Sequence, residues 1–497
     1  MTRLRHVCAL LVAIAMAMAL VVHPASGLAS DHGSRSGPVG SFALLGDDDD
    51  FDDDDDDDDV QPAPAPAPVF DDDDDDDVQP APVSDDDDND VQPVFDDDDD
   101  DDVQPAPVFD DDEPFGGGAV DEPRTDQVIV RLNPGVDPNT FAAQSGATVL
   151  RVIPSENIVL LAITFDRDDP DALESLFNDP AVVWGERNFS AQAPEGRPRY
   201  FFSGIDGTPQ LVDQPSLPAE LEFSPDASCA GGTSVVIAVL DTGVDANHPE
   251  LAANILPNGV NMVDNTFDLR DIGNGLDDDG DGQIDEMVGH GTHVAGTILQ
   301  VAPDASILPI KVLNSDGIGD AFFVTSGIFY AVEQGADVIN LSLGSTFDSR
   351  AVQDAIDVAA GQGVAIVAAV GNGGTAQPVE YPASLNSVIS VAALDADGNK
   401  AEYSNFNDSV DISAPGSGVA SSYPDGRYAT ASGTSMSTSI VAGSIALVLD
   451  RQPEIDPDAV ELILTSTADP LQLTDPALAD QLGAGALNID ASIACGG

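Results

Sequence analysis

Two kinds of apolar pattern alternate along the C-terminal half of the chain. Short unbroken runs rich in Val and Ile are separated by longer stretches in which apolar residues recur at helical spacing. Runs without polar alternation are typical of strands buried on both faces, and their separation by helices is typical of a parallel sheet. The expected strands are 235–240, 307–312, 338–343, 364–370 and 388–393, and the expected helices begin at 290 and span 320–334 and 350–362.

A smaller unit with a different order of elements precedes this region. Its apolar runs and two helical stretches follow one another as strand, helix, strand, strand, helix, strand, which is typical of a ferredoxin-like α+β unit. The expected strands are 128–132, 147–153, 158–165 and 181–184, and the expected helices are 138–145 and 171–177. The sequence thus predicts a small α+β unit (124–192), a linker and N-terminal arm (193–228), and an α/β domain (229–497).

The region 28–123 has no pattern that would bury a core. It holds 34 Asp between Asp47 and Asp112, and the motif Val-Gln-Pro starts at 60, 78, 91 and 103. Blocks of like charge repel one another and Pro-Ala alternation favours extended backbone, so we predict disorder. The tract is either a solvated spacer or a weak, multivalent calcium-binding tract, because carboxylates are good calcium ligands.

The charge balance excludes some partners. The formal net charge is −74, which rules out binding to nucleic acid through a general basic surface. Residues 40–122 contain 37 acidic and no basic residues, which leaves −37 for the rest of the chain. Hydrophobic residues make up 42% of the sequence, so the chain as a whole is not disordered.

The N-terminus resembles an export signal. Arg3 and Arg5 precede an apolar run from 7 to 22, and small residues follow it. This pattern predicts a signal peptide at 1–27 and a secreted protein, and the alternative is a retained membrane anchor. No later segment is apolar enough for stable membrane insertion. Removal of the signal peptide would leave two cysteines, Cys229 and Cys495, and an even count in an exported protein predicts a disulfide.

Three segments of the large domain each place a reactive residue beside glycine. Asp241 follows a buried strand in Asp-Thr-Gly, His290 opens a helix in Gly-His-Gly-Thr-His, and Ser435 opens another in Gly-Thr-Ser-Met-Ser. Serine needs a base beside it, histidine can take and return the proton, and a buried carboxylate orients the histidine. Singly, each residue has an ordinary explanation: a turn, a metal ligand paired with His293, or a helix cap. Jointly they predict nucleophilic catalysis.

The three segments together resemble the subtilisin-like serine proteases, whose catalytic residues follow the same order. The resemblance implies that Asp241 orients His290, that His290 is the general base and acid, and that Ser435 is the nucleophile. The segment Gly371-Asn372-Gly373 resembles the oxyanion segment of the family, so Asn372 would donate its side-chain amide. The implied fold is a parallel sheet with helices on both faces.

The resemblance also covers the substrate cleft. Two segments of this chain, 340–344 and 317–319, resemble the two rims of the family's cleft. A peptide substrate would lie between them as an added strand. The implied contact residues are Gly317, Gly319, Ser342, Leu343 and Gly344. Glu380 precedes a Tyr-Pro-Ala turn that lies, in the family, near the base of the primary specificity pocket. A carboxylate there would favour Lys or Arg before the scissile bond. The alternative is that Glu380 points to solvent and large apolar residues are preferred.

The segment 182–188 and the fold expected around it resemble the inhibitory propeptide of the family. The resemblance implies that 124–192 assists folding, inhibits the enzyme within the same chain and then leaves; the alternative is an independent small domain.

The chain departs from the family in two places. Ser437-Thr438-Ser439 replaces the usual Ala-x-Pro, so the serine helix lacks its Pro kink and Ser435 could be slightly shifted. Ala369-Val370 precedes the oxyanion segment, where two small residues are more usual.

An acidic loop lies between the Asp and His motifs. It follows the pattern of a calcium loop, with a Gly at the turn, although the bidentate Glu of that pattern is replaced by Val288. The expected ligands of a structural calcium ion are Asp277, Asp279, Asp281, Gln283 and Asp285. The alternative is a solvated loop without an ion.

The sequence therefore predicts a secreted serine endopeptidase, made as a self-processing proenzyme, that acts on proteins or peptides through an acyl-enzyme. The alternative from another class is a non-catalytic, polyanionic calcium-binding surface protein on a protease-like scaffold.

Overall fold

The computed structural model describes residues 123–165, 169–196, 209–218, 221, 223, 229–471, 473, 475–478 and 480–493. The expected signal peptide, nearly all of the Asp-rich region, much of the linker and Cys495 lie outside these residues. The described residues belong to one compact unit.

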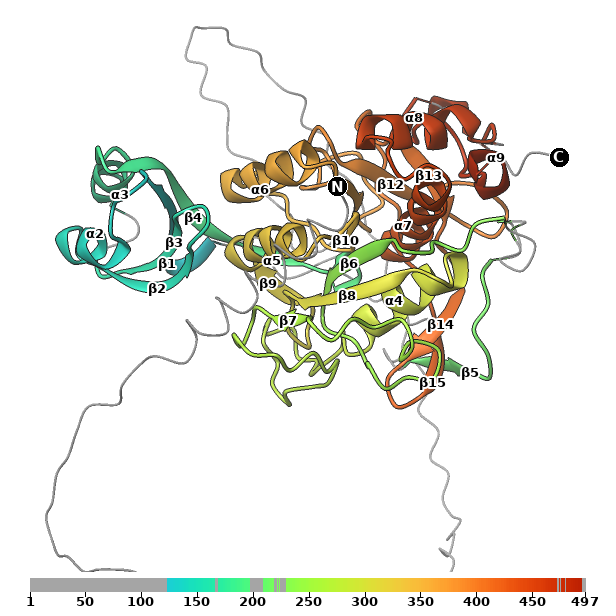
Figure 1. Ribbon diagram of the computed structural model, residues 1–497, viewed down its shortest axis with the longest axis horizontal. Helices are drawn as coiled ribbons and strands as arrows, with labels where there is room; N and C mark the ends of the chain where they lie inside the picture. The colour runs from blue at the N-terminus through green and yellow to red at the C-terminus, as the bar shows by residue number, and fades with distance from the viewer. Residues whose placement is uncertain are drawn as a thin grey trace, which may run out of the picture. The chain divides into compact units, whose positions relative to one another are not determined.

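The small N-terminal unit is an antiparallel sheet with two helices (Figure 1). The sheet order is β2-β3-β1-β4, and every neighbouring pair is antiparallel. Both helices begin at a Pro after an Asp whose side chain accepts a backbone N–H, which is a favourable helix start. This is the ferredoxin-like fold predicted from the sequence. The elements are β1 (Pro123–Leu132), α2 (Pro138–Gln144), β2 (Ala147–Ile153), β3 (Ile158–Ile163), α3 (Pro170–Phe177) and β4 (Val182–Gln192).

The last strand of this unit is longer than predicted. The apolar run ends at Trp184, but β4 continues to Gln192. Its final residues, Ser190–Gln192, pair antiparallel with β9 (Ile318–Asp320) of the large domain. The polar residues at 185–188 interrupt the apolar pattern, so the sequence did not show that the strand continues. Pairing with β1 as far as Phe189, and then with β9, extends the strand instead.

The large domain is built on a seven-stranded sheet of order β13-β12-β11-β10-β6-β8-β7, in which every neighbouring pair is parallel. The predicted α/β fold is confirmed. Helix α4 packs against α7, and α5 packs against α6. The strands are β6 (Val236–Asp241), β7 (Val260–Asn261), β8 (Ser306–Lys311), β10 (Val338–Leu341), β11 (Ala365–Ala369), β12 (Ile389–Leu394) and β13 (Ile412–Pro415), and the helices are α4 (His290–Val301), α5 (Ala321–Glu333), α6 (Arg350–Gly361) and α7 (Thr434–Arg451).

Helix α7 lies in the centre of the domain, and every residue from Thr434 to Val448 is buried. Its small polar residues satisfy their hydroxyls inside the helix, because Thr438 and Ser439 each donate to the carbonyl four residues earlier. Ser439 stands where the family usually has the kink-forming Pro, and its hydroxyl lies 2.7 Å from the carbonyl oxygen of Ser435. The helix therefore runs through this position without a break.

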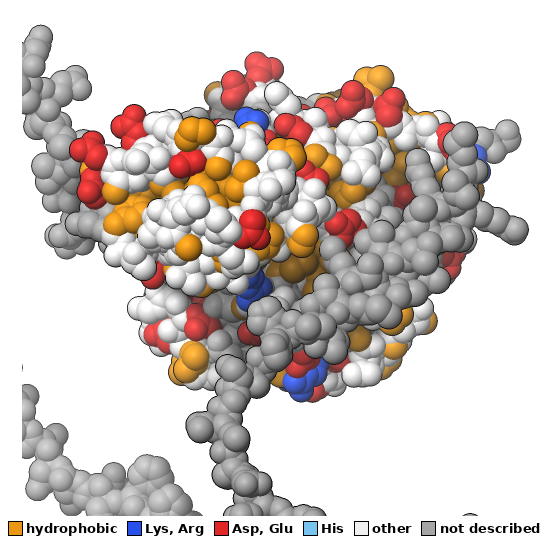
Figure 2. Space-filling view, turned by 60° about the vertical axis from the view of Figure 1, so that its left-hand side comes forward, with side chains coloured by type: hydrophobic (Ala, Val, Ile, Leu, Met, Phe, Trp, Pro, Cys, Tyr) orange, Lys and Arg blue, Asp and Glu red, His pale blue; other side chains and the backbone are white. Residues whose placement is uncertain are grey.

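The remaining elements surround this core. A second, three-stranded antiparallel sheet, two α-helices and two 3-10 turns were not predicted: β5 (Gln210–Val212), β14 (Val419–Tyr423), β15 (Arg427–Ala431), α8 (Pro457–Thr467), α9 (Ile489–Ile493), η1 (Pro194–Gly196) and η4 (Pro476–Leu478). Acidic side chains are spread over the face shown in Figure 2, whereas basic ones occur at few places on it. None of the described helices has the length and apolar character needed to cross a bilayer.

Candidate active site

The three predicted catalytic residues meet at the carboxyl-terminal edge of the large sheet. Asp241 ends β6, His290 is the first residue of α4, and Ser435 is the second residue of α7. The side chain of His290 is fully buried, and its Nδ1 lies 2.7 Å from Asp241 Oδ1. A carboxylate at Nδ1 holds the imidazole in the tautomer whose other nitrogen, Nε2, can exchange a proton with substrate.

Two hydrogen-bond donors beside Ser435 point to one position. The Nδ2 group of Asn372 and the backbone N–H of Ser435 donate to one and the same oxygen, at 3.0 and 3.3 Å. The amide of Asn372 is held in this orientation because its Oδ1 accepts from both the N–H and the hydroxyl of Thr434, each at 2.9 Å. The two donors inferred from the sequence are therefore brought together around one position.

The oxygen that accepts from both donors belongs to Glu195, a residue that sequence reasoning missed. Its Oε1 accepts from Asn372 and Ser435, as above. Its Oε2 lies 2.8 Å from Ser435 Oγ and 3.0 Å from His290 Nε2, so it stands between the nucleophile and the base. Glu195 belongs to a Pro-Glu-Gly turn in the linker, and nothing in the local pattern marks it. Its position in the site can be recognised only from the contacts that it makes in the folded chain.

The buried carboxylates change the charge state of the histidine. Burial alone would lower the pKa of His290, but Asp241 and Glu195 oppose this effect and raise it to about 10. Burial alone would raise the pKa of Glu195, but its interactions with His290, Ser435 and Asn372 hold it below its ordinary value. At neutral pH, His290 is therefore an imidazolium between two carboxylates.

The second histidine of the motif has a structural role. Nε2 of His293 lies 3.1 and 3.2 Å from the carbonyl oxygens of Val419 and Ala429, in the hairpin β14–β15. Burial, reinforced by the charge of His290, lowers the pKa of His293 to about 4. A neutral imidazole that donates to backbone joins α4 to this hairpin.

A further buried carboxylate, Asp271, was also missed. It is 2% exposed, and it accepts the N–H of Gly289 at 3.0 Å and both the N–H and hydroxyl of Thr292 at 3.1 and 2.7 Å. Gly289, at the N-terminus of α4, makes no side-chain cap of its own, so Asp271 supplies the cap from a distant loop. Asp271 also accepts from Thr242 Oγ1 at 3.1 Å. It thus joins the residue after Asp241 to the start of the His290 helix.

The end of β4 occupies the predicted substrate cleft. Gln192 and Gly344 exchange two backbone hydrogen bonds, at 3.0 and 2.8 Å, and Ala193 donates to the carbonyl of Gly317 at 2.9 Å. On the side of the strand that faces β9, Ala191 pairs with Gly319. Leu343 lines an apolar pocket beside Phe189 and Ala191. The hydroxyl of Ser342 donates to the carbonyl oxygen of Ser435, at 3.3 Å. All five predicted cleft residues therefore border this strand or the nucleophile.

Glu380 lies in the same pocket as Asn372. It lines a cavity that opens to solvent, and it is half-buried rather than fully exposed. A Cβ added to Gly344 would lie 3.2 Å from Glu380 Oε2, and one added to Gly371 would lie 2.8 Å from Glu380 Cγ. The carboxylate therefore lies between the two glycine-lined walls of the cavity, whose other lining residues are Gln192, Pro194, Thr346, Asn372, Gly373, Thr375, Pro378 and Asn405.

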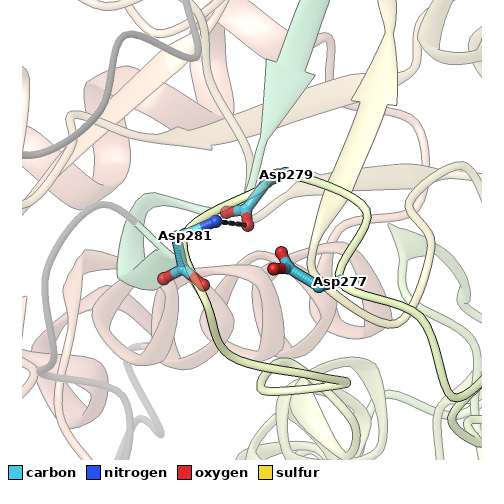
Figure 3. Close-up of side chains that lie close together, drawn as sticks. All are labelled: Asp277, Asp279 and Asp281. Atoms are coloured by element: carbon cyan, nitrogen blue, oxygen red, sulfur yellow. Dashed lines mark hydrogen bonds between the residues drawn. The ribbon is translucent and has the colours of Figure 1, made fainter.

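The acidic loop brings three of its five predicted ligands together. Asp277, Asp279 and Asp281 place carboxylate oxygens within 4.8 Å of one another, and Figure 3 shows them around the turn of the loop. The carboxylate of Asp285 instead accepts the N–H groups of Asn274 and Gly275, with Oδ1 lying 2.7 Å from the first.

The remaining predicted ligand, Gln283, turns its side-chain amide to Asp281, at 2.7 Å. Both carboxylate oxygens of Glu286 are buried without a hydrogen-bond partner among the described residues. Burial and the charges of Asp316, Asp279 and Asp281 raise the pKa of Glu286 to about 8. Such crowding of acidic groups fits the donor set of a divalent cation.

Cys229 is disulfide-bonded, and it is the one cysteine within the described residues. The pairing of Cys229 with Cys495 therefore stays a prediction.

Comparison with known proteins assigns the class. A model described as the subtilase family matches residues 232–485, which is half of the chain. Subtilisin DY of Bacillus licheniformis is 37% identical over 273 residues, covering 52% of this chain and 91% of that protein. Thermitase of Thermoactinomyces vulgaris is 40% identical over 251 residues, covering 50% and 84%. The chain belongs to the subtilase family, and it is a serine endopeptidase.

The N-terminal unit is also assigned. A model described as the fervidolysin N-terminal prodomain matches residues 115–188. The structure of fervidolysin from Fervidobacterium pennivorans, described as a keratinolytic enzyme related to subtilisin, superposes with a TM-score of 0.59 at 23% identity. The match covers 74% of this chain and 60% of that one, and it shows a shared fold. The chain is a subtilase with an N-terminal prodomain of the fervidolysin type.

Proposed function

We propose that this protein is a secreted serine endopeptidase made as a self-processing proenzyme, with Asp241, His290 and Ser435 as its catalytic triad. One observation carries the proposal. The nucleophile, the base and both oxyanion donors converge on a single carboxylate, at 2.8 to 3.3 Å. A set of groups that surrounds one position in this way can also surround the reacting carbonyl of a peptide.

The chemistry follows from these positions. Once the cleft holds substrate, Ser435 Oγ attacks the carbonyl carbon while His290 Nε2 takes its proton. The resulting oxyanion is held by Asn372 Nδ2 and the Ser435 N–H. The carbon–nitrogen bond then breaks as His290 returns the proton to the leaving amine, which leaves an acyl-enzyme on Ser435. Water, deprotonated by His290, attacks this ester, and the second tetrahedral intermediate collapses to release the acid and regenerate the serine.

The prodomain is proposed to assist folding of the peptidase domain and to inhibit it. Glu186 on β4 supports this role because its carboxylate accepts from Ser349 Oγ, and from the N–H groups of Arg350 and Ala351 at the start of α6. Trp184 Nε1 donates to Asp354 of the same helix, at 2.7 Å. The prodomain thus caps a helix of the enzyme while its last strand fills the substrate cleft.

A structural calcium ion is proposed in the acidic loop. The residues that would hold it are Asp277, Asp279 and Asp281, with Gln283 and Asp285 as the other expected contributors. The buried carboxylate of Glu286, which finds no partner among the described residues, supports a nearby cation. Calcium would neutralise the charge of the loop and fix its shape, and no step of peptide hydrolysis passes through it.

Glu380 is proposed to select Lys or Arg in the residue before the scissile bond. Its half-buried position in a cavity next to Asn372 supports this role over the solvent-facing alternative. A cationic side chain would reach a carboxylate with which it can pair, whereas an apolar one would leave that carboxylate poorly hydrated.

The test of the proposed function is Ser435→Ala in the full-length precursor, produced in a host without proteases. We expect it to remain uncleaved and to react with no fluorophosphonate probe, while the unchanged precursor matures and is labelled. Ser437→Ala, two residues away on the same helix, is the matched control and should mature. Self-processing by the Ser435→Ala precursor would contradict the proposal. Fluorophosphonate labelling also excludes the polyanionic binding protein, since only an activated serine reacts.

A further inference from the structure

The linker residue Glu195 contacts every polar group that the proposed mechanism uses on substrate. One carboxylate oxygen accepts from Asn372 Nδ2 and Ser435 N–H, and the other lies against Ser435 Oγ and His290 Nε2. The residue is 2% exposed. Gly433 permits this approach, because a Cβ there would lie 1.9 Å from Glu195 Oε1.

The group in the oxyanion hole is a side chain and not a peptide carbonyl. The backbone follows the cleft as a strand up to Ala193 and then turns in η1, Pro194–Gly196. A carboxylate already carries the negative charge that a carbonyl oxygen acquires only during attack, so the hole binds it well. It is also a poor electrophile with no amine to expel. The centre is therefore filled by a group that it binds and does not cleave.

The carboxylate of Glu195 also prevents His290 from acting as a base. With Asp241 at Nδ1 and Glu195 at Nε2, His290 stays protonated at neutral pH, since its pKa is raised to about 10. An imidazolium cannot take the proton of Ser435, whose hydroxyl instead donates to Glu195 Oε2. Nucleophile, base and oxyanion donors are thus all engaged at once.

The chain keeps this ligand in place. Pairing of Ser190–Gln192 with β9, and of Gln192 with Gly344, fixes the backbone three residues before Glu195. A tethered ligand has a high effective concentration at its site, so a carboxylate that would bind weakly from solution is held firmly. Once the tether is cut and the prodomain leaves, that advantage is lost.

We propose that Glu195 is an internal ligand of the catalytic centre, which holds the precursor inactive until it is displaced, and that the centre accepts acidic peptides presenting a glutamate side chain at the same place. The inference rests on the proposed function and deepens it, since it names a class of inhibitor for that site. Such a ligand is a peptide that fills the cleft as Asn188–Glu195 does and ends in a carboxylate-bearing side chain.

The first test compares self-processing of full-length precursors. Glu195→Gln keeps the shape of the side chain and removes its charge, and Glu174→Gln changes an exposed glutamate on α3 as the matched control. Hydrogen bonds to a charged group are worth enough that we expect Glu195→Gln to mature roughly ten- to a hundredfold faster, with the control unchanged. A Glu195→Gln precursor that matures at the wild-type rate or more slowly would overturn the proposal.

The second test uses peptides, and it stands even if the variant precursor fails to fold. The octapeptide Asn188–Glu195, acetylated and amidated so that no terminal carboxylate is present, is added to self-processed wild-type enzyme. We expect it to inhibit at least tenfold more tightly than the same peptide with Gln in place of the last residue. Equal inhibition by the two peptides would overturn the proposal.

These outcomes are separate from failure of the proposed function. If the self-processed protein neither hydrolyses peptides nor reacts with a fluorophosphonate, the enzyme itself is disproved. If it is active and labelled at Ser435, but neither its maturation rate nor its inhibition by the peptide depends on the charge at position 195, only the role of Glu195 as a ligand is disproved.

Discussion

Two regions of the molecule present a buried carboxylate to the same histidine, with opposite consequences. Asp241 lies at the end of a central strand, where its own Oδ1 also accepts the next backbone N–H at 2.7 Å. Glu195 lies in a turn after an edge strand of the prodomain. In the proposed mechanism, Asp241 contacts Nδ1, which faces away from substrate, and so prepares the base. Glu195 contacts Nε2, which must face substrate, and so blocks it. The chemistry of the two groups is the same, and position decides the effect.

The largest expected effect separates these two roles. Asp241→Asn in the full-length precursor should slow self-processing by about 10⁴-fold, because the imidazole loses its correct tautomer. The change of Glu195 to Gln described above should act in the opposite direction. Asp245→Asn, in the same motif, is the control and should change the rate by no more than a few fold. The measurement is the rate of precursor loss on a denaturing gel. Equal slowing by Asp241→Asn and Asp245→Asn would contradict a specific role of Asp241 in orienting His290.

A third carboxylate, Glu380, sharpens the comparison because it should contact substrate without touching His290. Glu380→Gln should lower kcat/KM for chromogenic peptides with Arg or Lys before the scissile bond by roughly 10- to 100-fold. Peptides with Phe or Leu at that position should be unaffected. Glu402→Gln provides an exposed control on a neighbouring turn. If wild-type enzyme prefers Phe and Leu, and the variant keeps that ranking, Glu380 has no part in selection.

Asp271 is expected to act through His290 as a positioning residue. Asp271→Ala should lower kcat by roughly 10- to 100-fold with little change in KM, since a small displacement of the base slows the reaction while the cleft remains intact. The rate of Ser435 labelling by a fluorophosphonate should fall in parallel. Asp268→Asn changes an exposed carboxylate of the same loop and should leave both rates unchanged. A purely structural role would lower the melting temperature and leave kcat of the folded fraction intact.

Inhibition through Glu195 should depend on pH. Its carboxylate raises the pKa of His290, so binding takes up a proton and is strongest below the pKa of His290 in the free enzyme. Above that value, up to about pH 10, inhibition by the Glu195 peptide should weaken ~tenfold per pH unit. Two other groups near the site have pKa values outside this window: the pKa of His293 is lowered to about 4, and that of Tyr403 is raised by burial. The Gln peptide should show a flat profile.

The exposed carboxylates of the acidic loop offer the contrasting case of charge without burial. A chelator should lower the melting temperature by about 5–10 °C when calcium was present at roughly 100 times its Kd. Asp279→Ala should blunt that response, and Asp397→Asn, in an exposed turn elsewhere, should not. Thermal unfolding followed by circular dichroism gives the answer. If the chelator does not change the melting temperature, the proposed structural calcium ion in the loop is refuted.

Local sequence determined the fold class and the identity of the central groups. Apolar runs predicted five strands of the parallel sheet to within two residues at each end, because two-sided burial requires continuous apolar residues; the short strands β7 and β13 were not predicted. Asp241, His290 and Ser435 could be found because each lies in a short glycine-containing motif whose backbone geometry is set by its neighbours. Asn372 was found for the same reason.

Only the tertiary structure decided what surrounds these groups. Glu195 is 240 residues from Ser435 and 95 from His290, and Asp271 caps a helix whose N-cap residue, Gly289, lies 18 residues further on. Neither residue lies in a periodic apolar segment or in one of the catalytic motifs, so no local pattern identifies it. Likewise, β4 continues past its apolar run because first β1 and then β9 supply hydrogen-bond partners. The burial and charge that turn an ordinary glutamate into a ligand of the catalytic centre come from groups that meet only in the folded chain.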